Sequence, residues 1–264
     1  RVALKVLLPS YTAQAEMEQR FLNEARAVNQ VSHPGLVNIF DFGKSTNGYA
    51  YIAMEFIDGI TLATFLRRRT RFLLYQGLCV LQQLAVTLTA VHARQIVHRD
   101  LKPTNIFVMR DDAVLGGIRM KLFDFGIAKI GGQTGDSGAA QNAQRMLTQT
   151  GVFLGTPYYI APEQIQDPGQ VTDRADVYSF GVILYQMLSG HVPFEGDAMW
   201  VLLRQATERP VPLQLVIPDL PAELGALSEA MLDKSPGMRP SMDDTLMTCP
   251  RPRDLKCGST SCVP

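Results

Sequence analysis

The stretch from Ile96 to Val108 places an acid, a base and an amide within six residues. Asp100 could accept a proton, Lys102 could neutralise a neighbouring anion, and Asn105 could hold a metal ion through its side-chain carbonyl. Pro103 can neither continue a helix nor join a strand ladder, so this stretch is predicted to be a loop. The alternative is a polar surface turn that carries these residues by coincidence.

A second acid, Asp124, follows the apolar run that begins at Met120. A lone carboxylate at the end of a buried strand is unstable unless it is paired or bound to a metal. Magnesium prefers oxygen ligands and is usually held by one or two protein groups together with phosphates. Asp124 and Asn105 therefore form the candidate metal site.

Lys5 interrupts the apolar strand expected from Val2 to Leu7, and Glu24 lies within a helical pattern expected from 13 to 31. Glu24 falls on the edge of the apolar helix face, where an unpaired charge is costly. Lys5 is its candidate partner. A lysine on the solvent face of its strand is the alternative interpretation.

Further elements must position these residues. Apolar patterns predict strands at Leu36–Phe42 and Tyr49–Phe56, a helix at Tyr75–Ala93 and a central helix with Thr172 as its N-cap. The last helix contains Asp176, an unusual acid for a helix that is apolar on several faces.

These motifs resemble, in the same order, those of the Hanks-type serine/threonine protein kinases. The amino-acid sequences of several stretches are similar to those of bacterial members of that family. The resemblance runs from Val2 to about Met247. Its carriers are Val2-Ala3-Leu4-Lys5, Glu24, His98-Arg99-Asp100 with Asn105, Asp124-Phe125-Gly126, Ala161-Pro162-Glu163, Asp176 and Arg239.

The resemblance implies an α+β fold of two lobes, with a small N-lobe sheet plus one mobile helix and a mostly helical C-lobe. It places the N-lobe at 1–54, the hinge at 55–59, the C-lobe at 60–247 and a disordered or foreign tail at 248–264. The first two strands of the family, which carry its glycine-rich loop, have no counterpart in this sequence.

The implied chemistry is transfer of the ATP γ-phosphate to a protein serine or threonine. Lys5, held by Glu24, would orient the α- and β-phosphates, and Asn105 and Asp124 would hold Mg²⁺. Asp100 would orient the acceptor hydroxyl and take its proton, and Lys102 would stabilise the transferred phosphoryl group. The resemblance assigns the adenine contacts to Ala3, Met54 as gatekeeper, the backbone of Glu55 and Ile57, and Phe107.

Structural roles are implied for Asp176, which would hold the backbone of the catalytic loop, and for a Glu163–Arg239 ion pair. Arg99 has no obvious partner nearby in the sequence. We expect a phosphate on Thr148 or Thr150 to pair with it and to order the glycine- and serine-rich segment around them, as in autophosphorylated kinases.

Composition excludes several other classes. The 25 basic and 25 acidic residues balance, which argues against a nucleic-acid partner. The longest apolar runs, such as Tyr49–Met54, contain six residues and are too short to span a bilayer. The four cysteines match no zinc pattern, so a reducing, cytoplasmic location is expected, and a membrane tether elsewhere in a parent chain is compatible with it. Because the chain starts at Arg1 inside a strand, we expect a fragment.

Three alternatives stay open. Without the glycine-rich loop this chain could bind ATP weakly and act as a pseudokinase-like binding module, which the intact Lys5, Asp100 and Asp124 disfavour. A small-molecule kinase is disfavoured by Lys102, Thr156 and the Ala161-Pro162-Glu163 triplet, and a tyrosine kinase is disfavoured by Lys102. The sequence indicates neither the protein substrate nor the oligomeric state.

Overall fold

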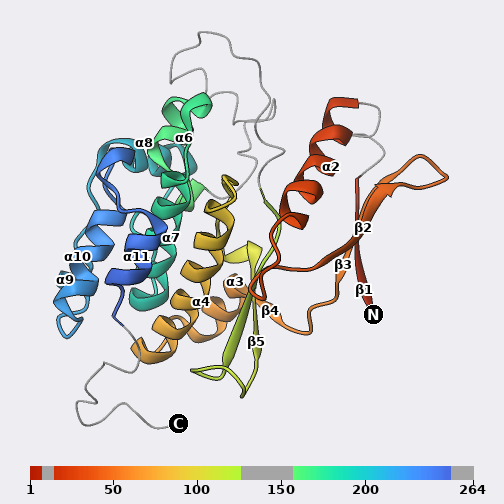
Figure 1. The fold of residues 1–264 in the computed structure, drawn as a ribbon. Coiled ribbons are helices and arrows are strands. Elements are labelled where there is room, and N and C mark those ends of the chain that lie inside the picture. The colour runs from red at the N-terminus through yellow and green to blue at the C-terminus, as the bar shows by residue number, and fades with distance from the viewer. Residues whose placement is uncertain (8–14, 126–156, 251–264) are drawn as a thin grey trace.

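A computed structural model of the chain describes residues 1–7, 15–125 and 157–250. A small lobe built on a sheet stands beside a larger, mostly helical lobe (Figure 1). The expected α+β architecture of two lobes is therefore confirmed.

The small lobe pairs three antiparallel strands in the order β1-β3-β2 and packs one helix against them. Its core consists of Phe21 and Ala25 from the helix and Ala50 and Ile52 from the central strand. Among the described strands, the first pairs only with the central one. The elements are β1 (Val2–Val6), α2 (Ala15–Asn29), β2 (Ile39–Lys44) and β3 (Ala50–Glu55).

The large lobe carries a second small sheet, of order β4-β5-β6, and a set of helices around one apolar core. Its elements are β4 (Ile60–Thr61), α3 (Leu62–Arg69), α4 (Leu74–His92), η1 (Pro103–Asn105), β5 (Ile106–Arg110), β6 (Ile118–Leu122), η3 (Pro157–Tyr159), α6 (Pro162–Gln166), η4 (Pro168–Gln170), α7 (Arg174–Ser189), α8 (Ala198–Thr207), α9 (Leu213–Val216), α10 (Ala222–Met231), η5 (Pro236–Met238) and α11 (Met242–Thr248).

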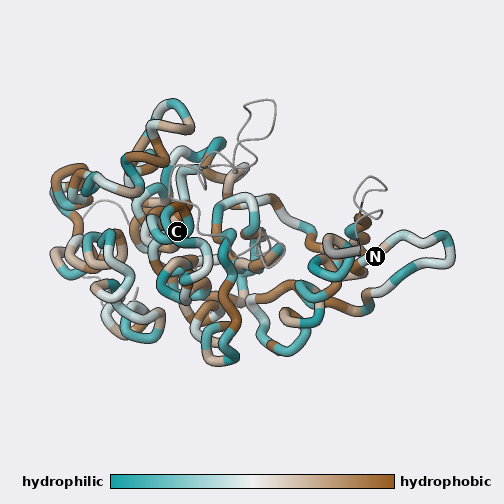
Figure 2. Tube along the Cα trace, turned by 90° about the horizontal axis from the view of Figure 1, so that it is seen from above, coloured by the Kyte–Doolittle hydropathy of each residue, from teal (hydrophilic) through white to brown (hydrophobic). Residues whose placement is uncertain are grey.

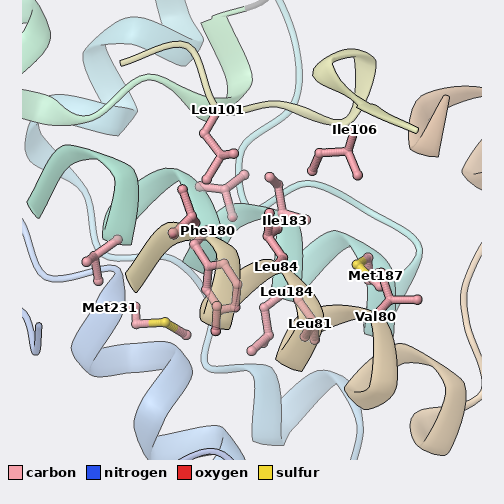
Figure 3. Close-up of a cluster of buried hydrophobic side chains, with 14 of the residues drawn as sticks. Val80, Leu81, Leu84, Leu101, Ile106, Phe180, Ile183, Leu184, Met187 and Met231 are labelled. Carbon is pink, nitrogen blue, oxygen red and sulfur yellow. The ribbon is translucent and has the colours of Figure 1, made fainter. Parts of the chain in front are cut away.

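Helices α4 and α7 form the centre of this lobe. Leu81 and Leu84 of α4 face Phe180 and Ile183 of α7, and Met231 of α10 closes the cluster (Figure 3). Helix α7 is apolar on most of its faces, so it must be covered on all sides, as the sequence predicted. This rigid centre supports the loops that lie above it.

Hydrophobic positions run through the elements of the large lobe, whereas the turn between β2 and β3 projects as a largely polar hairpin (Figure 2). Among the described helices, α4 alone is long and apolar enough to cross a membrane by length and composition. Its most apolar window is 56% buried within the lobe, as expected of a core helix.

Most predicted elements differ from the observed ones by one or two residues at their ends, and three boundaries differ in a way that matters for the fold. The strand predicted from Leu36 begins at Ile39, because Leu36 instead bridges to Leu122 in the other lobe. The N-cap of α7 is Asp173, not Thr172. Cys249 is buried and its amide donates to the Thr245 carbonyl at 3.0 Å, so the fold continues past 248. Residues 251–264 lie outside the described part of the chain.

Candidate active site

A cavity of about 430 Å³ lies between the two lobes. It is lined by eight of the nine residues that the sequence assigned to the nucleotide or to the metal ion, and Asn105 is the ninth. The eight are Ala3, Lys5, Glu24, Met54, Glu55, Ile57, Phe107 and Asp124. Their proposed roles stay predictions, but the structure brings them into one crevice.

Strand alternation directs Lys5 into this cavity. In β1, Val2 and Leu4 are exposed on one face of the strand, whereas Ala3 and Lys5 are partly buried on the other. Ala3, Leu4 and Lys5 all contribute to the lining of the cavity. The Nζ of Lys5 lies 3.4 Å from Oε1 of Glu24 in α2 and also contacts Oδ1 of Asp124. Lys5 therefore joins a carboxylate of its own lobe to one from the large lobe.

The electrostatics of this cluster follow from burial and from the nearness of two acids. Burial raises the pKa of Glu24 to about 7, with Asp124 adding to the effect and Lys5 opposing it. Burial alone would lower the pKa of Lys5, but Glu24 and Asp124 together outweigh it and raise that pKa above 10.5. Lys5 is thus a fixed cation, and a bound cation near Asp124 would relieve the repulsion between the two acids.

The catalytic loop is fixed from below by Asp176 of α7, as the sequence predicted. Its Oδ2 accepts the backbone N–H of His98 and its Oδ1 that of Arg99, both at 2.8 Å. The Nε2 of His92, at the end of α4, lies 2.8 Å from Oδ2 of the same carboxylate. Asp176 is 1% exposed, so these partners are what makes its burial tolerable.

Asp100 and Lys102 leave this loop side by side. The Nζ of Lys102 lies 2.8 Å from Oδ2 of Asp100, and neither residue lines the 430 Å³ cavity. Asn105 joins them to it: its Nδ2 donates to the Asp100 carbonyl at 2.9 Å and to the Asp124 carbonyl at 3.3 Å. Asp100, Asn105 and Asp124 therefore form one connected group.

Asn105 and Asp124 suit a divalent cation. The Asn105 Nδ2 donates to the two backbone carbonyls and to Oδ2 of Asp100, which fixes the amide. Its Oδ1 accepts the Thr104 hydroxyl at 3.4 Å and keeps a second lone pair with which to ligate. Lys5 contacts Oδ1 of the Asp124 carboxylate, so Oδ2 is the oxygen outside that ion pair. An oxygen pair of this kind is the donor set that Mg²⁺ prefers.

No role was predicted for His98, whose side chain is fully buried. Its ring packs on Phe125 with centroids 4.5 Å apart, and its Nδ1 accepts the Asp100 N–H at 3.3 Å. Burial lowers the pKa of His98, so the ring is a neutral support. The only indication in the sequence was the position of His98 directly before Arg99 and Asp100.

Lys121 was also missed. It contacts Oε1 of Glu55, which also accepts the N–H of Asn38 at 3.2 Å, and it donates to the Leu36 carbonyl at 3.3 Å. The backbone N–H of Glu55 donates to the Asn38 carbonyl at 2.9 Å. The N–H of Glu55 is therefore already paired within the protein.

A second cavity, of about 550 Å³, opens beside Lys102 on the large lobe. Tyr158 and Tyr159 form one wall and Gln186 of α7 another, with the hydroxyl of Tyr159 donating to Oε1 of Gln186 at 2.7 Å. Sequence reasoning did not find this cavity, because its lining comes from segments far apart in the chain. Gly126, Thr148, Thr150 and Thr156 lie outside the described residues.

The fold and the site together define a protein kinase. Residues 1–248 match the family model of the protein kinase domain, and the chain belongs to this family.

Among curated proteins, the chain is 41% identical over 245 residues to serine/threonine-protein kinase pkn2 of Myxococcus xanthus, covering 91% of this chain and 28% of the relative. It is 39% identical over 244 residues to serine/threonine-protein kinase PknA of Mycobacterium tuberculosis, covering 90% of this chain and 52% of the relative. The chain thus spans about half or less of the length of these relatives.

Proposed function

We propose that this chain catalyses transfer of the ATP γ-phosphate to serine or threonine hydroxyls of a protein. The observation that carries the proposal is the contact of Lys5 with Asp124 in one cavity, with Asp100 held to the same group through Asn105. The similarity to named serine/threonine-protein kinases supports the same class of substrate.

The residues divide the work between binding and proton transfer. Lys5, held by Glu24, would bind the phosphates of the nucleotide, and the apolar walls of the cavity would hold its base. Asp100 would orient the acceptor hydroxyl and take its proton, while Lys102 would balance the charge beside it. Mg²⁺ held by Asn105 and Asp124 would supply neutralisation of phosphate charge.

The cavity beside Lys102 supports a polypeptide acceptor. It shares no lining residue with the 430 Å³ cavity between the lobes, and Lys102 is part of its lining. Gln164 belongs to α6, the helix that starts within the Ala161-Pro162-Glu163 triplet, and its Nε2 donates to the Arg99 carbonyl at 2.8 Å. Helix α6 is thus tied directly to the catalytic loop.

Labelled ATP, Mg²⁺ and dephosphorylated casein test this function. Asp100→Asn keeps the shape of the side chain but removes its basicity, so we expect transfer to fall by roughly 10²- to 10⁴-fold. Asp112→Asn is the matched control, because that carboxylate is exposed and pairs only with exposed Arg110 among the described residues. Equal activity of Asp100→Asn and the wild type would refute the assignment.

A further inference from the structure

The 550 Å³ cavity beside Lys102 is here called the acceptor cavity. Two backbone carbonyls in its wall accept hydrogen bonds from buried side chains. The hydroxyl of Ser179 in α7 donates to the Tyr159 carbonyl at 2.6 Å. The Nε2 of Gln205 in α8 donates to the Tyr158 carbonyl at 2.5 Å. The short turn η3 is therefore fastened at adjacent residues to two different helices.

Gln205 is itself held by further groups. It is fully buried, and its Oε1 accepts the hydroxyl of Tyr178, which is also fully buried. The ammonium of Lys234 donates to the Tyr178 oxygen at 2.7 Å. Each group in this series donates to the next, so a relay of hydrogen bonds runs from Lys234 to the Tyr158 carbonyl.

Cations hold the tyrosine ring at the centre of this relay. Lys234 lies 5.0 Å from the centroid of the Tyr178 ring and 4.9 Å from that of Phe194. The guanidinium of Arg239 lies 4.8 Å from the Tyr178 centroid. Contacts of this kind fix both the plane and the position of the ring.

Packing alone does not require these polar groups. An apolar side chain could fill the place of Gln205 without the cost of burying an amide, and a phenylalanine could fill that of Tyr178. Both polar groups are satisfied, and together they fix where the Tyr158 backbone lies.

We propose that Lys234, Tyr178 and Gln205 are positioning residues that set the Tyr158 wall of the acceptor cavity and thereby control affinity for the protein substrate. This inference rests on the proposed function, in which that cavity receives the acceptor.

Tyr178→Phe removes one hydroxyl and keeps the ring. We expect the KM for dephosphorylated casein to rise roughly two- to tenfold, as for one lost hydrogen bond, with kcat and the KM for ATP unchanged. Tyr185→Phe is the matched control, because Tyr185 is a buried tyrosine of the same helix outside the relay. If Tyr178→Phe changed the KM for casein and the KM for ATP equally, or changed neither, the proposal would be overturned.

A double variant tests whether the two residues act in series. Gln205→Met keeps the volume of the side chain but removes both of its hydrogen bonds. If the relay runs through Gln205, adding Tyr178→Phe to Gln205→Met raises the KM for casein no further. Additive effects would mean that the residues act separately and would contradict the relay.

Amide hydrogen exchange separates failure of the relay from failure of the proposed function. A wild-type chain that transfers no phosphate to casein would fail the functional proposal, yet the relay still predicts faster exchange at residues 158–160 in Tyr178→Phe. The amides of His98 and Arg99, which donate to Asp176, should exchange at an unchanged rate. Unchanged exchange at 158–160 would refute the relay.

Discussion

At the scale of single residues, two residues of the site adopt the left-handed backbone conformation. Arg99 has φ 63° and Asp124 has φ 62°, a conformation that costs a non-glycine residue about 1–2 kcal/mol. The N–H of Arg99 is held by Asp176, and the carbonyl of Asp124 by Asn105. Hydrogen bonds from neighbouring elements therefore maintain both strained positions.

Glu24 leads to a prediction about pH. Its pKa of about 7 in the fold exceeds the ordinary 4.5, so the folded state binds this proton more tightly than the unfolded state. The resulting stabilisation, on the order of 3 kcal/mol, is fully present below pH 4.5 and is lost as pH rises through 7. Urea unfolding of the wild type and of Glu24→Gln at pH 5 and pH 8 measures it.

The side chain of Glu24→Gln cannot titrate. The free energy of unfolding of the wild type, relative to that of the variant, should therefore decrease from pH 5 to pH 8. A difference that does not change over this range would contradict the raised pKa. Glu18→Gln, in the exposed pair with Lys44, controls for general charge effects.

The sequence identified the Lys5–Glu24 pair because a buried acid on a helix edge requires a cation. It did not indicate that Lys5 also meets Asp124, 119 residues away. Such sharing depends on how the two lobes close, and no local pattern encodes that.

At the scale of elements, α7 organises the large lobe. Asp176 holds the catalytic loop, and Ser179, one turn later, holds the Tyr159 carbonyl. The apolar pattern predicted a central helix, and Asp176 stood out as an acid within it. Tyr178 and Gln205 did not stand out, because a buried tyrosine or glutamine has no distinctive spacing in a sequence.

The ion pair between Arg239 and Glu163 joins the C-terminal part of the lobe to α6. Arg239 donates to both carboxylate oxygens, at 2.7 and 2.9 Å, and its side chain is 0% exposed. Glu163→Gln keeps the shape but leaves a buried charge unpaired, so we expect the free energy of unfolding to fall by about 3–5 kcal/mol. Urea denaturation measures this loss.

The exposed pair of Arg204 and Glu208, 3.5 Å apart, is the control for that variant. Glu208→Gln should change stability by less than about 1 kcal/mol, because solvent screens surface ion pairs. Similar losses in the two variants would mean that burial does not strengthen the Arg239 pair.

At the scale of the whole molecule, the lobes are joined at the rear of the nucleotide cavity. The Leu122 N–H donates to the Gly35 carbonyl at 2.7 Å, and the Val37 N–H to the Leu122 carbonyl at 3.0 Å. The Lys121–Glu55 ion pair adds a charged contact between β6 and the end of β3. The sequence predicted two lobes, but not these contacts, because their partners lie at least 66 residues apart.

Lys121→Met should weaken nucleotide binding. It leaves the Glu55 carboxylate without its cation beside the cavity, so we expect the KM for ATP to rise roughly two- to tenfold with the KM for casein unchanged. Steady-state kinetics with each substrate varied in turn measure this. Lys44→Met, which breaks only an exposed pair, should alter neither constant; an unaltered KM for ATP in Lys121→Met would argue against the contact.

The attachment of both the catalytic loop and the η3 turn to α7 has a kinetic consequence. Rotation of the small lobe would withdraw Lys5 from Asp124, yet Asp100 and Tyr159 would keep their register because one helix carries their supports. A protein acceptor could therefore dock on an open molecule, and spent nucleotide could depart while the acceptor stays seated.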